Sequence, residues 1–267
     1  MAPLALVTGA SSGIGLELAK QFAANGFDLI VTAEDAELAD AAQQVRESGD
    51  GQVESVQVDL ALPGGVDALW SAVTALGRPL DAAALNAGVG AGGAFATDTK
   101  LEDELRVIDL NVRSTVHLAK HVVQQMVARD SGRILFTSSI GAALPGSYHA
   151  VYNASKSFVQ SFALAIRDEL RDSGVTVTLL LPGPTETEFF ERADMLDTPI
   201  GSSPKSQDDP ADVARDGFEA LMNGDERVVS ASLSTKLQGR GSRFLPDSAK
   251  AAMHRRMAQP ADGDDAA

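Results

Sequence analysis

A glycine-rich turn between two apolar segments, close to the amino terminus, most strongly constrains the fold of this chain. Residues 4–7 form a short apolar run of the kind found in buried parallel strands. Thr8 and Gly9 end that run, and apolar residues then recur at helical spacing from Ile14 to Phe22. The order strand, glycine turn, helix predicts the first unit of an open α/β sheet, which binds ligands at the carboxyl ends of its strands.

Three glycines in this turn have separate predicted roles. Gly9 makes the tight turn, Gly13 lets the backbone approach a pyrophosphate, and Gly15 lets the helix pack closely on the strand. Free N–H groups at the start of the helix favour the charge of a phosphate. Taken alone, the same glycines are also compatible with an ordinary turn.

Turn residues that include a carboxylate or an amide stand at three further points where predicted strands end. They are Glu34 and Asp35 after the strand at 28–33, Asp59 and Leu60 in the segment 56–60 that ends a third strand, and Asn86, Ala87 and Gly88 after 83–85. Because ligands bind at these strand ends, we expect the residues to contact one bound molecule. Each of them alone is equally compatible with a simple turn.

A tyrosine and a lysine four residues apart form the second informative motif. Tyr152 and Lys156 lie in a segment with helical apolar spacing, so both side chains project from one helix face. A free phenol has a pKa of about 10, and a nearby ammonium lowers that pKa toward a useful range. The pair can therefore supply a general acid or base.

Hydroxyl groups precede this pair at the end of a strand predicted at 133–138. Ser139 lies thirteen residues before Tyr152, and Ser138 is the rival candidate for holding a substrate oxygen. The other tyrosine, Tyr148, has Tyr152 rather than a lysine four residues later.

Together, the glycine turn, Thr137-Ser-Ser139 and Tyr152-Asn-Ala-Ser-Lys156 resemble the short-chain dehydrogenase/reductase family. The resemblance extends from about Leu4 to Val229. It implies an α/β fold, namely a Rossmann-type doubly wound parallel sheet of about seven strands in a single domain, which we place at residues 1–259. The glycine spacing G-x-x-x-G-x-G differs from that of two-domain dehydrogenases and from that of longer epimerase and dehydratase relatives, which disfavours a lyase or an epimerase.

The resemblance implies that Asn111, Ser139, Tyr152 and Lys156 are catalytic. Tyr152 would exchange a proton with the substrate oxygen while Ser139 positions that oxygen. The backbone carbonyl of Asn111 would hold a water near Lys156 and complete a proton relay. The implied reaction is hydride transfer between a nicotinamide cofactor, NAD or NADP, and a carbonyl or alcohol substrate.

The resemblance also implies a set of cofactor-binding residues. They are Gly9, Ser11, Ser12, Gly13, Ile14, Gly15, Glu34, Asp59, Leu60, Asn86, Ala87, Gly88, Tyr152, Lys156, Pro182, Gly183, Thr185 and Thr187, of which Thr187 fits the carboxamide-contacting position better than Thr185.

Glu34 favours NAD over NADP. It occupies a position where NADP-preferring relatives often carry arginine, and its carboxylate would repel a 2′-phosphate. NAD-preferring relatives usually place an aspartate one residue earlier, where this chain has Ala33. A solvated helix start is the alternative interpretation of Glu34 and Asp35.

The carboxyl-terminal third is predicted to contain a substrate lid, followed by an extension to which the sequence assigns no role. We expect a substrate lid near residues 188–208, a partly helical extension at 231–259 and a disordered acidic tail at 260–267. His149 is a candidate for the wall of the substrate pocket.

Composition excludes several classes of function. The net charge of −15 disfavours a nucleic-acid partner, and zero cysteines exclude disulfides and thiol chemistry.

His117 and His121 lie one helical turn apart, but the sequence offers no third ligand, so we expect no metal site. Without an apolar stretch long enough for a membrane span or a leader-like start, a cytoplasmic protein is expected. The family resemblance also implies that the chain assembles into a homodimer or homotetramer.

The leading hypothesis is thus an NAD(P)-dependent oxidoreductase that interconverts a carbonyl and an alcohol. A non-catalytic dinucleotide sensor or scaffold on the same fold is the alternative, and intact Ser139, Tyr152 and Lys156 speak against it.

Overall fold

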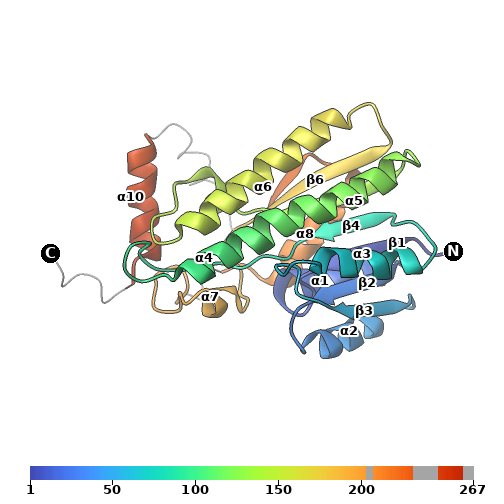
Figure 1. Ribbon diagram of the computed structural model, residues 1–267, viewed down its shortest axis with the longest axis horizontal. Helices are drawn as coiled ribbons and strands as arrows, with labels where there is room; N and C mark the ends of the chain where they lie inside the picture. Colours follow the sequence, from blue (N-terminus) through green and yellow to red (C-terminus); the bar gives the residue numbers. More distant parts are fainter. Residues whose placement is uncertain (203–206, 231–245, 261–267) are drawn as a thin grey trace.

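The computed structural model describes residues 1–202, 207–230 and 246–260. Its central sheet has seven parallel strands in the order β3-β2-β1-β4-β5-β6-β7 (Figure 1). The strands are β1 (Leu4–Thr8), β2 (Asp28–Ala33), β3 (Val53–Gln57), β4 (Ala82–Leu85), β5 (Gly132–Thr137), β6 (Val175–Pro182) and β7 (Arg227–Ser230). The predicted fold class is confirmed.

Helices cover both faces of the sheet because adjacent strand residues point to opposite sides. In β1, Leu4 and Leu6 pack into one hydrophobic core and Ala5 and Val7 into the other. The first core includes side chains from α3 (Gly65–Ala75), α5 (Thr115–Val127) and α6 (Ala150–Glu169). The second includes side chains from α1 (Gly13–Ala24), α2 (Leu38–Glu47) and α8 (Pro210–Asn223).

Local sequence explains where α8 begins and ends. The side chain of Asp209 accepts a hydrogen bond from the backbone N–H of Ala211 and so caps α8, and Pro210 occupies the first helical turn. Gly224 ends the same helix in a left-handed conformation with φ of 73°. The boundaries of α8 are therefore set by local capping.

One predicted helix is interrupted. The sequence predicts a single helix over residues 101–129, whereas the structure has α4 (Leu101–Ile108), a π-helical turn η1 (Asp109–Ser114) and then α5. A π-turn shifts the i→i−4 hydrogen-bonding pattern, and such turns occur frequently at functional sites. This one contains Asn111.

The strand order reverses between β1 and β4, which are neighbours in the sheet. Their carboxyl ends therefore flank the crevice in which ligands bind in open α/β sheets. Three short or peripheral elements surround this edge: η2 (Ile140–Ala143), α7 (Phe189–Arg192) and α10 (Asp247–Ala258). Figure 1 shows α10 near the end of the molecule where α4 and α6 begin.

The predicted lid and extension are described only in part. Residues 203–206 of the lid and 231–245 of the extension lie outside the described residues, as does the predicted tail apart from Pro260. Among the described residues, every helix is too short or too polar to cross a bilayer.

Candidate active site

A cavity of about 530 Å³ lies at the carboxyl edge of the sheet. Every predicted cofactor-binding residue lines it, together with Ser139. Asn111 is the predicted site residue that does not. The structure thus brings residues from all parts of the chain to one cavity of a size typical of ligand pockets.

The glycine turn forms a close-packed floor. Gly9 has a φ of 65°, which permits the tight turn after β1. A methyl group added to Gly15 would lie 1.8 Å from the carbonyl oxygen of Gly9, so the helix packs directly on the turn. Gly13 has a φ of 54°, and its added methyl would lie 2.8 Å from Cγ2 of Thr187. This side-chain-free cradle before the amino terminus of α1 fits a dinucleotide pyrophosphate.

Thr8, which the sequence interpretation missed as a site residue, joins the ends of β1 and β4. Its hydroxyl oxygen accepts hydrogen bonds from the backbone N–H groups of Asn86 and Ala87, each at 3.0 Å. The side-chain amide of Asn86 donates in return to the carbonyl of Thr8 at 3.2 Å. These bonds hold the predicted ribose-side turn in place.

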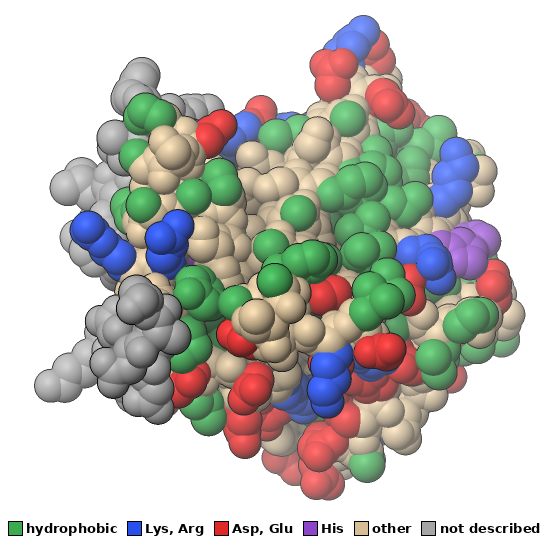
Figure 2. Space-filling model, turned by 60° about the vertical axis from the view of Figure 1, so that its left-hand side comes forward, with side chains coloured by type: hydrophobic (Ala, Val, Ile, Leu, Met, Phe, Trp, Pro, Cys, Tyr) green, Lys and Arg blue, Asp and Glu red, His purple; other side chains and the backbone are tan. Residues whose placement is uncertain are grey.

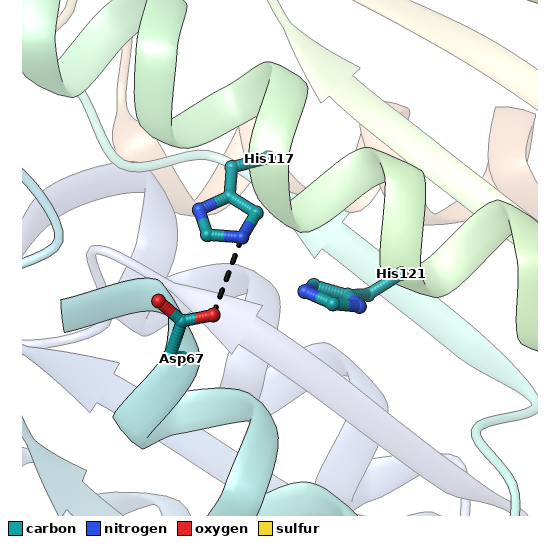
Figure 3. Close-up of side chains that lie close together, drawn as sticks. All are labelled: Asp67, His117 and His121. Atoms are coloured by element: carbon teal, nitrogen blue, oxygen red, sulfur yellow. Dashed lines mark ion pairs between the residues drawn. The ribbon is translucent and has the colours of Figure 1, made fainter. Parts of the chain in front are cut away.

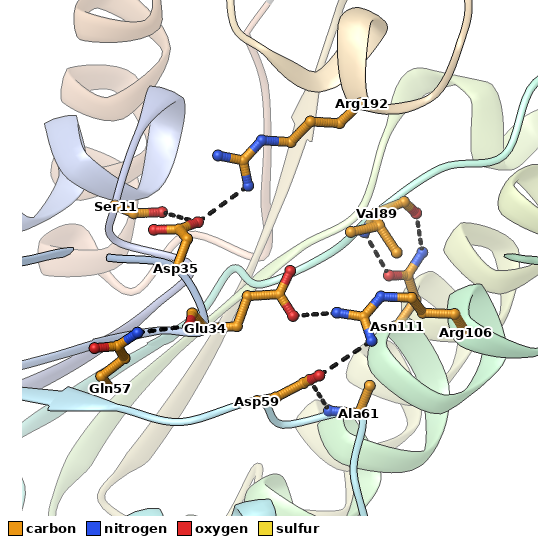
Figure 4. A network of polar contacts seen from close by, with 10 residues as sticks. All are labelled: Ser11, Glu34, Asp35, Gln57, Asp59, Ala61, Val89, Arg106, Asn111 and Arg192. Carbon is orange, nitrogen blue, oxygen red and sulfur yellow. Dashed lines mark hydrogen bonds and ion pairs between the residues drawn. The ribbon is translucent and has the colours of Figure 1, made fainter. Parts of the chain in front are cut away.

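An arginine joins the two predicted acidic residues at the opposite end of the cavity. Arg106 of α4 pairs with Glu34, and its other terminal nitrogen lies 3.1 Å from Asp59 Oδ2 (Figure 4). The third strand ends at Gln57 rather than at Asp59. Asp59 instead lies in the following turn, where its Oδ1 accepts a hydrogen bond from the Ala61 N–H, so the predicted strand boundary was wrong.

A second arginine reaches across the cavity from α7. Arg192 of α7 lies 3.1 Å from Asp35 Oδ2 and 2.7 Å from Glu188 Oε2, and Ser11 donates to the same Asp35 oxygen at 3.0 Å. Figure 4 shows Arg192 reaching toward Asp35 from the opposite wall. No local sequence signal points to Arg106 or Arg192, because each acts on residues far away in the chain.

Ser139 and Tyr152 both line the cavity, and the Ser139 side chain lowers the pKa of the nearby phenol. Ser139 also caps η2, since its Oγ accepts from the N–H of Gly141 at 3.1 Å. Ser138 Oγ instead donates to the backbone carbonyl of Lys156 at 2.7 Å, with the residue only 2% exposed. This engagement favours Ser139 over Ser138 as the hydroxyl that meets a substrate.

Lys156 lies beside this pair in a dry environment. Its Nζ is 5.7 Å from the centroid of the Tyr152 ring and donates to the carbonyl of Thr137 at 3.1 Å. A methyl group on Gly88 would lie 3.0 Å from that nitrogen, so glycine makes room for the ammonium. Burial lowers the pKa of Lys156 to about 8.

In this structure the Lys156 ammonium does not lower the pKa of Tyr152, so that expectation was wrong. Burial raises the pKa of Tyr152 to about 12, and the Ser139 side chain offsets only part of that rise. Desolvation dominates the pKa of Tyr152 because the phenol is enclosed, while the Lys156 Nζ is 5.7 Å from the ring centroid. The acid form of the tyrosine is therefore strongly favoured.

Asn111 supports the site from behind its wall. Its side chain forms two hydrogen bonds with the backbone of Val89, each 2.9 Å long, and donates a third to Ser155 Oγ at 2.9 Å. These bonds join η1 to the loop after β4 and to α6. The side chain is therefore fully engaged in the architecture.

The turn after β6 brings the predicted nicotinamide-side residues to the cavity. The N–H of Gly183 donates to the carbonyl of Ser230 in β7 at 2.9 Å, which holds this turn. Thr185 is 5% exposed and donates to the Gly183 carbonyl at 3.0 Å. Thr187 contacts the glycine floor at Gly13, as described above.

An aromatic wall stands next to Tyr152. The ring of His149 is stacked on that of Tyr152, with centroids 4.4 Å apart, and the Phe189 ring lies 5.0 Å from Tyr152. Burial lowers the pKa of His149 to about 3, so its imidazole is neutral at pH 7. Among the described residues, its buried Nε2 has no hydrogen-bond partner.

The helix α10 closes the far side of this wall. His254 Nδ1 lies 2.8 Å from the carbonyl oxygen of Ser147, and the N–H of Ile200 donates to the carbonyl of Met257 at 3.0 Å. Met253, His254 and Met257 line the cavity. The sequence placed a helical segment here but assigned it no role.

The structure also supplies a third side chain of metal-ligand type that the sequence did not offer beside the histidine pair. Asp67, from the first turn of α3, lies beside His117 and His121 of α5 (Figure 3). The separation of His117 Nε2 and Asp67 Oδ1 is 3.4 Å. The reason given for expecting no metal site, the absence of a third ligand, was therefore wrong.

Comparison with known proteins identifies the family. A family model described as short chain dehydrogenase matches residues 3–195. The chain belongs to the short-chain dehydrogenase/reductase family. It is therefore an oxidoreductase of the NAD(P)-dependent kind, with β7 and α10 outside the matched region.

Curated relatives share the body of the family fold. An uncharacterized short-chain type dehydrogenase/reductase of Sinorhizobium fredii is 35% identical over 190 residues, which cover 71% of this chain and 73% of the relative. An NADP-dependent 3-hydroxy acid dehydrogenase of Salmonella typhimurium is 31% identical over 180 residues, covering 67% and 71%.

Solved structures extend the likeness to nearly the whole chain. A short-chain dehydrogenase from Sphingobium yanoikuyae in complex with NADPH matches with a TM-score of 0.79 and 28% identity, covering 97% of this chain and 98% of the other. A family member from Burkholderia phymatum in complex with NAD matches with a TM-score of 0.81 at 24% identity, covering 90% and 92%. At 24% identity, the match to the Burkholderia phymatum protein shows a shared fold only.

Proposed function

We propose that this short-chain dehydrogenase/reductase reduces a carbonyl compound or oxidises the corresponding alcohol with Ser139, Tyr152 and Lys156 as its catalytic residues. The observation that carries this assignment is that Ser139, Tyr152 and buried Lys156 line the same cavity as the glycine floor, with the Lys156 ammonium beside the Tyr152 ring. When bound, the nicotinamide cofactor supplies or accepts the hydride.

The chain's own residues handle the oxygen and its proton. In the reducing direction the substrate oxygen accepts hydrogen bonds from Ser139 Oγ and Tyr152 Oη, and the phenol then transfers its proton to that oxygen. The raised pKa of Tyr152, about 12, keeps this proton in place until charge develops on the substrate oxygen. The ammonium of Lys156, beside the phenol, holds the proton that replaces the one given to the substrate.

Asn111 is proposed to complete the proton path through its backbone. Its side chain is committed to Val89 and Ser155, so the role rests on the carbonyl, which lies in the π-turn. A water held there would connect Lys156 with solvent. Asn111 is thus a positioning residue in this proposal.

NAD is the proposed cofactor in preference to NADP. Glu34 lines the cavity where the adenosine ribose is expected and would repel a 2′-phosphate. Arg106 compensates part of that charge, yet the ion pair also keeps the guanidinium engaged with carboxylates. The preference therefore depends on Glu34 and Arg106 together.

The substrate is proposed to be a neutral, largely apolar carbonyl compound with one further polar group. Phe189, Met195 and Met257 provide an apolar wall, and the neutral His149 provides one free nitrogen near Tyr152. Initial rates with ketones of graded size, with and without a second oxygen, test this; a uniform preference for carboxylate-bearing substrates contradicts it.

We also propose that the chain forms one domain over residues 1–259. In this domain, residues 188–208 are a substrate lid and residues 231–259 are an extension. The ion pair from Arg192 to Asp35 and the contacts of α10 with Ser147 and Ile200 support both. In this arrangement α7 closes over the cofactor, and α10 closes over the substrate.

Self-association into a homodimer or homotetramer is also proposed. Figure 2 shows hydrophobic side chains gathered on the face that α4 and α6 form. The exposed ones include Leu101, Leu105 and Phe158. A cytoplasmic location is proposed as well, in keeping with zero cysteines, and fractionation of cells that express the chain would test it.

Cofactor consumption separates catalysis from mere binding. Nicotinamide fluorescence is followed while the protein is mixed with reduced cofactor and a panel of carbonyl compounds. We expect binding followed by consumption with at least one compound class. Binding without any consumption across the panel would favour a dinucleotide sensor instead.

A further inference from the structure

We propose that Asp67, His117 and His121 form a surface site for a divalent transition metal of the zinc class between α3 and α5. None of the three residues lines the nucleotide cavity. The proposal is therefore independent of the oxidoreductase activity and can fail or succeed without it.

The two histidines have a spacing suited to chelation. His117-Leu-Ala-Lys-His121 separates the imidazoles by one helical turn of α5, so both project from the same face. The same His-x-x-x-His spacing on a helix holds zinc in the H-E-x-x-H motif, here without its glutamate. The pair alone is common on helix surfaces, and a third ligand is what distinguishes a site.

Asp67 provides that ligand from a different helix. One oxygen or nitrogen atom from each of the three residues lies within 4.8 Å of the others, and His117 Nε2 is 3.4 Å from Asp67 Oδ1. Ligand bonds of about 2.0–2.1 Å in a tetrahedron require ligand atoms roughly 3.4 Å apart. The distance between His117 Nε2 and Asp67 Oδ1 already has this value. The Asp67 side chain is 64% exposed and can rotate to shorten the others.

The imidazole ring of His121 is held in place by stacking. Its ring is stacked on Trp70 of α3, with centroids 5.0 Å apart and an interplanar angle of 13°. Its Nε2 is buried and has no hydrogen-bond partner among the described residues. A buried ring nitrogen without a partner costs free energy, which coordination to a metal would recover. In Figure 3 the ring faces the gap that it shares with Asp67 and His117.

The ligand set selects the class of metal. Two imidazoles and one carboxylate suit zinc and its neighbours, whereas magnesium and calcium prefer all-oxygen surroundings. Three protein ligands leave a fourth position for water. The net charge of −15 further favours the approach of a cation. Because metal binds only where α3 and α5 are packed together, it stabilises the folded chain.

The test is a titration of the full chain, freed of metal by a chelator, with ZnCl₂ in a calorimeter. We expect one site whose affinity falls by at least about tenfold in His117→Ala, in His121→Gln and in Asp67→Asn. The same salt should raise the melting temperature of the wild type and of no ligand variant. MgCl₂ should neither bind there nor compete.

His254→Asn is the matched control, because His149 and His254 are the two remaining histidines and both line the cavity. Zinc affinity unchanged in this control and lost in the α5 variants supports the site. Zinc affinity lost in His254→Asn but kept in His117→Ala overturns it, as does an absence of zinc binding by the wild type. Unchanged affinity in Asp67→Asn would leave only a histidine pair and overturn the three-ligand site. Circular dichroism of each metal-free variant verifies that it has folded.

Discussion

The imidazole of His149 and the phenol of Tyr152 are stacked with their centroids 4.4 Å apart and their planes 18° apart. Burial lowers the His149 pKa to about 3, with a further contribution from nearby His254. Unfolding exposes this imidazole to water, where its pKa returns to about 6.5. The proton affinity of His149 is therefore tied to folding.

Acid should destabilise the protein partly through His149. Between pH 3 and 6.5 the unfolded chain binds this proton and the folded chain does not, so the free energy of unfolding falls as the pH falls below about 6.5. His149→Phe keeps a ring for stacking and should reduce the loss of stability between pH 7 and pH 4 by up to about 3 kcal/mol. Urea unfolding at both pH values measures it. Phe95→Leu, which alters an exposed side chain without a titratable group, is the control and should leave the loss unchanged.

Replacement of Tyr152 should remove turnover and spare binding. Tyr152→Phe deletes the hydroxyl that donates the proton, so we expect kcat to fall by about 10²–10⁴. Cofactor affinity, measured by nicotinamide fluorescence, should change by less than about twofold, because the glycine floor is untouched. Tyr148→Phe removes the hydroxyl of the other tyrosine and should keep most activity. Full activity in Tyr152→Phe would refute the catalytic assignment.

Cofactor preference should respond to Glu34 through Arg106. Glu34→Gln removes the repulsive carboxylate and frees the guanidinium, so we expect the ratio of kcat/KM for NADP to that for NAD to rise at least about tenfold. Glu34→Arg should shift the ratio in the same direction. Adding Arg106→Gln to Glu34→Gln should cancel most of the gain. An unchanged ratio in the single variants removes Glu34 from cofactor selection.

The ion pair between Arg192 and Asp35 should slow the release of cofactor. Exposed ion pairs contribute about 0.2–1 kcal/mol, so Arg192→Gln should raise the dissociation rate constant of the cofactor by up to about fivefold. Stopped-flow fluorescence measures that rate. Arg215→Gln, which breaks an exposed ion pair with Asp212 on α8, is the control and should have no effect. An equal change in both variants would argue against a lid function for α7.

Self-association should depend on the exposed face of α4 and α6. Leu105→Glu and Phe158→Glu place charge on this face, so we expect the mass measured by light scattering after size exclusion to fall to that of a single chain. Leu62→Glu alters a comparably exposed apolar residue outside α4 and α6 and should leave the mass unchanged. A single-chain mass for the wild type would contradict the proposed oligomer.

Much of the fold could be predicted because its signals are local. The apolar run of β1, the glycines after it and the four-residue spacing of Tyr152 and Lys156 act through backbone sterics and helix geometry within a few residues. The seven-stranded parallel sheet follows from the same alternation of patterns.

The sequence by itself determined which elements form and which residues stand at the strand ends. Only the tertiary structure decided what meets across the cavity: Arg192 bonds Asp35 over 157 residues of chain, and Asp67 joins two histidines from another helix. It also decided that burial raises the Tyr152 pKa, against the expectation from Lys156 alone. The reason is physical, since ion pairs and desolvation depend on how whole elements pack, and no local stretch of sequence encodes that packing.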